Sequence, residues 1–167
     1  MKIERAYQHS VGPVEVFLMS ITPAYQEKKC EDAGALHWEV DVHVKDDDTA
    51  VVKAKRKMAT IGFPSLLRKI VPSSVTSTET VSWGPAEADG SRRAKVHVDF
   101  HGAPARMHGE LRLFPDPGGG STIVIDADFS IPVPFVGHKA EQLAAPIIFT
   151  VIESEERTAQ QWIAEAR

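Results

Sequence analysis

The chain has 167 residues and a net charge of −4, with 43% hydrophobic and 25% charged residues, which is typical of one folded domain over residues 1–167. The slight acidic excess disfavours nucleic-acid binding, and a single cysteine excludes a disulfide framework or a multi-cysteine zinc site. No apolar run reaches a membrane span and no signal peptide opens the chain, so we expect a cytoplasmic protein.

The N-terminal part of the chain predicts one strand followed by two short helices. The strand covers about residues 2–9, and Pro13 then opens an apolar run suited to the first turn of a helix. Thr22 followed by Pro23 repeats that pattern, with Thr22 as the expected N-cap. The second helix would continue to Gly34, which ends it.

The middle of the chain predicts six antiparallel strands joined by short turns. Between residues 36 and 131, apolar residues alternate with polar ones, and turn-rich segments separate the alternating runs. The first two strands fold about a triple-aspartate turn, which places Lys53 opposite Asp41. In that register the apolar faces of the strands coincide, and a slip by one residue would reverse a whole face.

The C-terminal part of the chain predicts one long helix over residues 137–166. Its apolar residues recur at helical spacing, and Pro146 is expected to kink or divide it. Only this helix is large enough to cover the apolar face of the sheet. The predicted fold is therefore α+β, with a seven-stranded antiparallel sheet, two short helices after the first strand, and the long helix packed across the sheet.

This order of elements resembles the helix-grip fold of the START and polyketide-cyclase-like superfamily, which pollen allergens share. The chain looks most like an uncharacterised bacterial family within it. The resemblance rests on the opening strand Met1–Ser10, the helix at residues 23–29, and the segments 63–69 and 78–83. It implies a curved sheet and a hydrophobic cavity between sheet and long helix, which other members use for lipids, steroids and polyketides.

Arg56 is unusual because strand alternation places it on the apolar face of its strand. The same alternation directs the neighbouring Lys53, Lys55 and Lys57 outward, which disfavours a nucleic-acid patch. A buried arginine needs a partner, and Glu79 is the inward-facing carboxylate on the following strand. Two interpretations stay open: a structural ion pair, which is favoured, and a polar handle that orients a ligand's carboxylate or carbonyl.

The main hypothesis is a binding protein that holds one small hydrophobic molecule in this cavity. Small residues would leave the space for it, namely Gly109, Ala127, Ala144 and Ala145. The expected ligand-binding residues are Trp38, Arg56, Met58, Glu79, Phe100, Phe129 and Phe149. The alternatives are an aromatase/cyclase-type enzyme, in which Arg56, Glu79 or Tyr7 positions a polyketide, and a co-chaperone-like module that binds a partner protein.

Neither the histidines nor the cysteine predict a metal site, a cofactor or a nucleophile. His97, Asp99 and His101 alternate on the polar face of one strand, with His108 on the same face of the next. That face should be solvated, where imidazoles lack the second layer of groups that orients metal ligands. Cys30 lies on an amphipathic helix and is expected to be a buried, neutral thiol.

Overall fold

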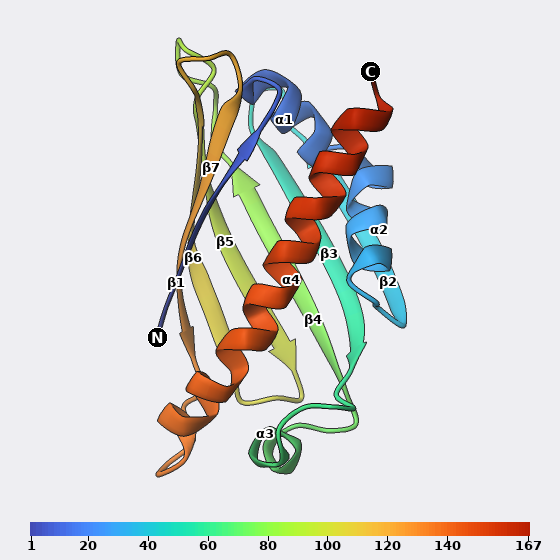
Figure 1. The fold of residues 1–167 in the computed structure, drawn as a ribbon, viewed down its shortest axis with the longest axis vertical. Helices are drawn as coiled ribbons and strands as arrows, with labels where there is room; N and C mark the ends of the chain where they lie inside the picture. Colours follow the sequence, from blue (N-terminus) through green and yellow to red (C-terminus); the bar gives the residue numbers. More distant parts are fainter.

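The computed structural model describes residues 1–167 and consists of one curved antiparallel sheet, with a long helix running across its concave face (Figure 1). The seven strands lie in the order β1-β7-β6-β5-β4-β3-β2. The elements are β1 (Lys2–His9), α1 (Pro13–Ser20), α2 (Pro23–Asp32), β2 (His37–Val44), β3 (Ala50–Ala59), α3 (Ser65–Ile70), β4 (Ser74–Trp83), β5 (Arg92–His101), β6 (Arg106–Pro115), β7 (Ser121–Ser130) and α4 (Gly137–Glu165).

The strand register confirms the predicted meander. Asp41 lies opposite Lys53 in the β2–β3 ladder, as the triple-aspartate turn predicts. The inner faces then continue across the sheet, with Val81 beside Val96 and, one strand further, Val96 beside Gly109. β1 adds a seventh strand at the far edge by pairing with β7. Alternation along each strand therefore identifies correctly which residues lie on the inner face of the sheet.

The core consists of two clusters, one toward each end of α4. The first packs α1 against the sheet, where the rings of Phe17 and Trp83 meet edge to face at 5.8 Å. The second surrounds Leu67 of α3 and Phe129 of β7. α4 contributes to both clusters, through Ala159 and Ile163 in the first and through Ala140, Ala144 and Ile152 in the second. No helix combines the length and the apolar character that crossing a bilayer would require.

Three local details differ from the sequence-based expectation. The pattern did not predict α3, a six-residue helix between β3 and β4. The long helix continues through Pro146, so the expected division is absent, while the expected kink stays a prediction; Pro146 lies on the exposed side, where water can reach the carbonyl that its ring leaves unpaired. Thr22 occupies the N-cap position of α2, but its hydroxyl donates to the carbonyl of Leu18 at 2.8 Å instead of capping the helix.

Candidate functional site

A cavity of about 300 Å³ lies between the inner face of the sheet and α4. Of its 37 lining residues, 29 are hydrophobic, so its walls are mainly apolar. Strands β3 to β7 supply one wall, and α4 supplies the other through Ala144, Ile147, Ile148, Val151, Ile152 and Glu155. At one end the lining includes Phe63 and Leu67, near α3, and at the other it includes residues of α1 and α2. The space suits a small molecule that is mostly hydrocarbon.

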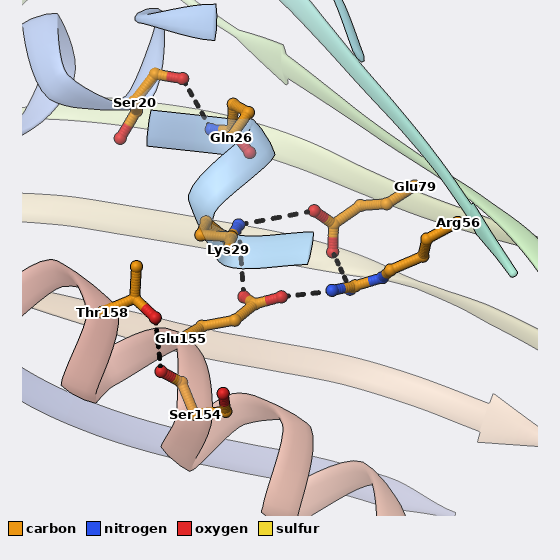
Figure 2. Close-up of polar contacts among 8 residues, drawn as sticks. All are labelled: Ser20, Gln26, Lys29, Arg56, Glu79, Ser154, Glu155 and Thr158. Atoms are coloured by element: carbon orange, nitrogen blue, oxygen red, sulfur yellow. Dashed lines mark hydrogen bonds and ion pairs between the residues drawn. The ribbon is translucent and has the colours of Figure 1, made fainter. Parts of the chain in front are cut away.

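Four charged side chains form a closed cluster on the wall of this cavity (Figure 2). Glu155 lies closest to both cations, with 3.0 Å between its Oε1 and an Arg56 guanidinium nitrogen and 3.2 Å between its Oε2 and Lys29 Nζ. Glu79 closes the ring more loosely, at 3.7 Å from Lys29 and 4.0 Å from Arg56. Two cations therefore face two carboxylates, and the formal charges of the cluster sum to zero.

Each member of the charged cluster comes from a different element. Arg56 and Glu79 stand on the inner faces of the neighbouring strands β3 and β4, where Glu79 pairs with Ala54 and so lies diagonal to the arginine. Glu155 projects from α4, and Lys29 projects from α2, which packs against both α4 and the β2–β3 edge (Figure 1). The cluster consequently forms only when both helices are docked on the sheet.

The cluster favours the ionised forms of Lys29, Arg56 and Glu155 despite their burial. Burial alone would raise the pKa of Glu155, but the charges of Lys29 and Arg56 outweigh it and hold that pKa below its ordinary value. Burial alone would lower the pKa of Lys29 and of Arg56, yet the facing carboxylates raise both. Opposite charges at close range favour the charged form of each group, which explains these directions.

Two tyrosines and a histidine add further polar groups to the cavity lining. Burial, together with the nearby Glu155 carboxylate, raises the pKa of both Tyr7 and Tyr25. His9 is buried beside Tyr7, with 5.3 Å between the ring centroids, and burial lowers its pKa. Gln26 also lines the cavity, but its amide donates to the carbonyl of Ser20 at 2.7 Å.

Five of the seven expected ligand-binding residues line the cavity, namely Arg56, Met58, Glu79, Phe100 and Phe129. The rings of Phe100 and Phe129 meet edge to face there, with centroids 6.1 Å apart. The anticipated contact between Arg56 and Glu79 is present, although Glu155 is the closer partner. Whether these five residues contact a ligand stays a prediction.

Trp38 and Phe149 are not among the lining residues, so their expected place in the cavity wall is wrong. Trp38 does lie opposite Arg56, but it belongs to the edge strand β2, against which α2 packs. α2 thereby covers the position that the sequence pattern assigned to the cavity. Phe149 is on α4, off the side that faces the cavity, and it packs against the second hydrophobic cluster instead.

Most of the small residues that were expected to create the cavity do not line it. Ala144 lines the cavity, but Gly109, Ala127 and Ala145 do not. Gly109 and Ala127 are paired across β6 and β7, and a Cβ on Gly109 would overlap the backbone of Asp126 and Ala127. The glycine therefore permits a close approach of two curved strands, which is a common reason for glycine within a strand.

Lys29 and Glu155 are site residues that the sequence analysis missed. Glu155 could have been found, because it continues the helical row of Ile147 and Val151 with a charged residue in an apolar stripe. Lys29 follows Tyr25 by four residues on the buried side of α2. Their meeting with Arg56 could not have been found, because it depends on how two helices dock on the sheet.

The remaining polar candidates lie where the sequence predicts. His97 is exposed on the outer face beside His108, and its Nε2 lies 2.9 Å from an Asp99 carboxylate oxygen. Cys30 is a free cysteine, 1% exposed, and burial raises the pKa of its thiol. These groups lie outside the cavity lining, and they carry no part of the site described here.

Comparison with known proteins identifies the family of this chain and proteins of similar fold. A family described as "Protein of unknown function (DUF2505)" matches residues 2–163. The chain belongs to this family. An uncharacterized protein of Mycobacterium tuberculosis is 25% identical over 119 residues, which cover 71% of this chain and 68% of that relative.

Two solved structures resemble the whole chain closely in architecture. An aromatase/cyclase of Streptomyces sp. R1128 has a TM-score of 0.59 at 12% identity, covering 96% of this chain and 92% of its own. Human STARD10 has a TM-score of 0.62 at 9% identity, covering 98% of this chain and 64% of its own. The DUF2505 chain thus has the helix-grip fold of the START and polyketide-cyclase-like superfamily. Identities this low show the fold alone.

Proposed function

We propose that this protein binds one small hydrophobic molecule, of the lipid, steroid or polyketide class, in the cavity between the sheet and α4. The observation that carries the proposal is the cavity itself, which has a volume of about 300 Å³, a mainly apolar wall and one cluster of paired charged side chains. Sites for small molecules generally combine an apolar lining with a few placed polar groups. The fold is of a ligand-binding type, which agrees with this use of the cavity.

Different lining residues would contact the apolar part and the polar part of the ligand. Met58, Phe100 and Phe129 would contact the hydrocarbon part of the ligand and remove it from water, which contributes about 25 cal/mol per Å² of apolar surface. Arg56 and Glu79 would face its polar end, together with the other members of the charged cluster. Affinity would then come mainly from the apolar wall, and orientation from the polar region.

A test of this proposal fills the cavity without changing the rest of the molecule. Ser77 lines the cavity on the inner face of β4, whereas the next residue, Thr78, is half-buried on the outer face, with 2.9 Å between its hydroxyl oxygen and His101 Nε2. Ser77→Phe and Thr78→Phe therefore add the same ring on opposite faces of one strand. Binding would be measured by the fluorescence increase of N-phenyl-1-naphthylamine, an uncharged apolar probe, and folding by a thermal melt.

The wild type and Thr78→Phe should bind one equivalent of the probe, and Ser77→Phe should bind it at least tenfold more weakly while still melting cooperatively. A tenfold loss corresponds to about 1.4 kcal/mol, which is within reach of a single obstructing side chain. Saturable binding that is equal in both variants would place the probe outside the cavity. That outcome, or no binding by the wild type, would contradict the proposal.

A further inference from the structure

Two phenolic hydroxyl groups stand in the cavity wall. Tyr7 comes from β1 and Tyr25 from α2, and both side chains line the cavity. Tyr25 is buried and Tyr7 is half-buried, and neither hydroxyl group is among the fully buried polar atoms that lack a partner, so both hydroxyl groups open onto the cavity. A hydroxyl group that opens onto a mainly apolar cavity can form a hydrogen bond with a ligand or with water.

Both rings are held in place by neighbouring aromatic groups. The ring of Tyr25 packs edge to face against Trp162 of α4, with centroids 5.5 Å apart. The ring of Tyr7 packs in the same way against His9, at 5.3 Å. Edge-to-face contacts fix the orientation of a ring, so the two hydroxyl groups are positioned before any ligand arrives.

The charged cluster beside these hydroxyls is already neutral and internally paired. Each cation contacts both carboxylates, and Glu155 contacts each cation within 3.2 Å. A ligand carboxylate placed here would add a third anion next to Glu79 and Glu155 in a poorly solvated space, where a net charge is very unfavourable. An uncharged ligand leaves the balance of the cluster intact.

The tyrosines can act as donors to such a ligand. Burial and the charge of Glu155 raise the pKa of both phenols, which keeps their protons in place. A protonated phenol donates one hydrogen bond and can accept others. The group that satisfies it best in an apolar cavity is an uncharged oxygen with free lone pairs.

We infer that the ligand of this site is an uncharged molecule that places a carbonyl or hydroxyl oxygen against the hydroxyl groups of Tyr7 and Tyr25, beside the neutral cluster of Lys29, Arg56, Glu79 and Glu155. This inference rests on the proposed function, because it requires that the cavity holds a ligand. It narrows the expected role of Arg56, which then holds the cluster together and faces a ketone or alcohol instead of pairing with an acid.

Three naphthalene probes of nearly the same shape test the charge and the acceptor separately. They are 2-acetylnaphthalene, which has a carbonyl, 2-isopropylnaphthalene, which lacks an acceptor, and 2-naphthoate, which is an anion. Each would compete with N-phenyl-1-naphthylamine for the wild-type protein. The ketone should displace that probe at a concentration at least tenfold lower than the anion. Equal or stronger competition by 2-naphthoate would overturn the inference.

Removing the two hydroxyl groups tests the named residues. In the double variant Tyr7→Phe/Tyr25→Phe, the affinity for 2-acetylnaphthalene should fall about tenfold, because two hydrogen bonds are lost. The affinity for 2-isopropylnaphthalene should stay within a factor of two or three. Thr78→Val, which removes an outer-face hydroxyl from the contact with His101, serves as the control and should change neither affinity. An unchanged ratio of ketone to hydrocarbon in the double variant would overturn the assignment to these tyrosines.

The same assay distinguishes a failure of the proposed function from a failure of this inference. If N-phenyl-1-naphthylamine does not bind to the wild type, the proposed function fails, and this inference fails with it. If the probe binds and Ser77→Phe blocks it, but 2-naphthoate competes as well as the ketone, the cavity is a binding site and only the uncharged class of ligand is wrong.

Discussion

Both faces of β3 carry positively charged side chains, but those on the outer face are exposed and the one on the inner face is buried. Lys53, Lys55 and Lys57 point outward and are exposed, while Arg56 points inward and is 9% exposed. The outer charges keep their hydration, and Lys53 and Lys55 face acidic residues of β2 across the ladder, whereas Lys57 faces His37. The inner charge has lost most of its water and is compensated by carboxylates from β4 and α4. The outer lysines stabilise the fold little, whereas the inner arginine requires its partners.

This comparison shows why the charged cluster ties the helices to the sheet. Arg56 and Glu155 are 99 residues apart in the chain, and their contact is made only when α4 lies across the sheet. Lys29 likewise joins the cluster only when α2 is docked. Separating either helix from the sheet would leave an unpaired charge beside an apolar wall. The charged cluster is therefore complete only when both helices are docked on the sheet.

The largest loss of stability is expected from removing α4, which covers the inner face of the sheet. Deleting residues 140–167 removes most of α4, including Glu155 and the residues that α4 contributes to both hydrophobic clusters. At about 25 cal/mol per Å², the apolar surface exposed outweighs the ordinary net stability of a domain. The truncated chain should show no cooperative thermal transition. A monomeric truncated protein that still melts cooperatively would contradict this role of α4.

The next largest effect should come from removing one charge of the inner cluster. Glu155→Gln leaves Lys29 and Arg56 with only the more distant Glu79. Breaking a buried ion pair on one side costs about 3–5 kcal/mol, so the free energy of unfolding in urea should fall by roughly that amount. The double change Arg56→Met/Glu155→Gln removes one charge of each sign and should be less destabilising than Glu155→Gln alone. The opposite ranking would mean that the charges do not depend on one another.

Lowering the pH should weaken the inner cluster without a mutation. The pKa of Glu155 lies below its ordinary value in the folded protein, so its stabilising effect is complete above the unfolded value of about 4.3 and is lost as the pH falls through the folded pKa. Glu155→Gln lacks this titration. The stability difference between the wild type and Glu155→Gln should therefore be constant above about pH 5 and shrink below pH 4. A constant difference down to pH 3 would contradict the depressed pKa.

The smallest effect should be found on the outer face of the same strand. Lys55 lies opposite Glu39 in the β2–β3 ladder and is exposed. Exposed pairs contribute about 0.2–1 kcal/mol and are screened by salt. Lys55→Gln should therefore change the free energy of unfolding by less than about 1 kcal/mol, and less still in 1 M NaCl. A loss as large as that of Glu155→Gln would remove the contrast between the two faces.

The sheet could be predicted from the sequence because the face of each residue and the register of each hairpin depend on residues that are close together in the chain. Alternation fixes the face of each residue, and one charged pair across a short turn, Lys53 with Asp41, fixes the register of the first hairpin. The same parity placed Arg56 and Glu79 correctly on the inner face. It also misled at Trp38, because alternation gives the face of an edge strand but not the helix that covers it.

The rest of the site depends on how helices dock, which no local pattern contains. Glu155 was visible as a charge in an apolar stripe, but its partners come from α2 and β3. Phe149 has the composition of a cavity residue, yet its position around the helix axis turns it toward the second cluster. The space itself arises from strand curvature and helix placement, while Gly109, which the sequence suggested as a source of space, only allows two strands to approach.

The most direct test of the central claim is native mass spectrometry of the protein purified from its own host, followed by identification of any retained molecule after denaturation. The account predicts one bound molecule per chain, mostly hydrocarbon, uncharged, and carrying a ketone or hydroxyl group. Ser77→Phe purified in the same way should lack that molecule, and Thr78→Phe should keep it. A retained carboxylic acid, or the same molecule on both variants, would contradict the account.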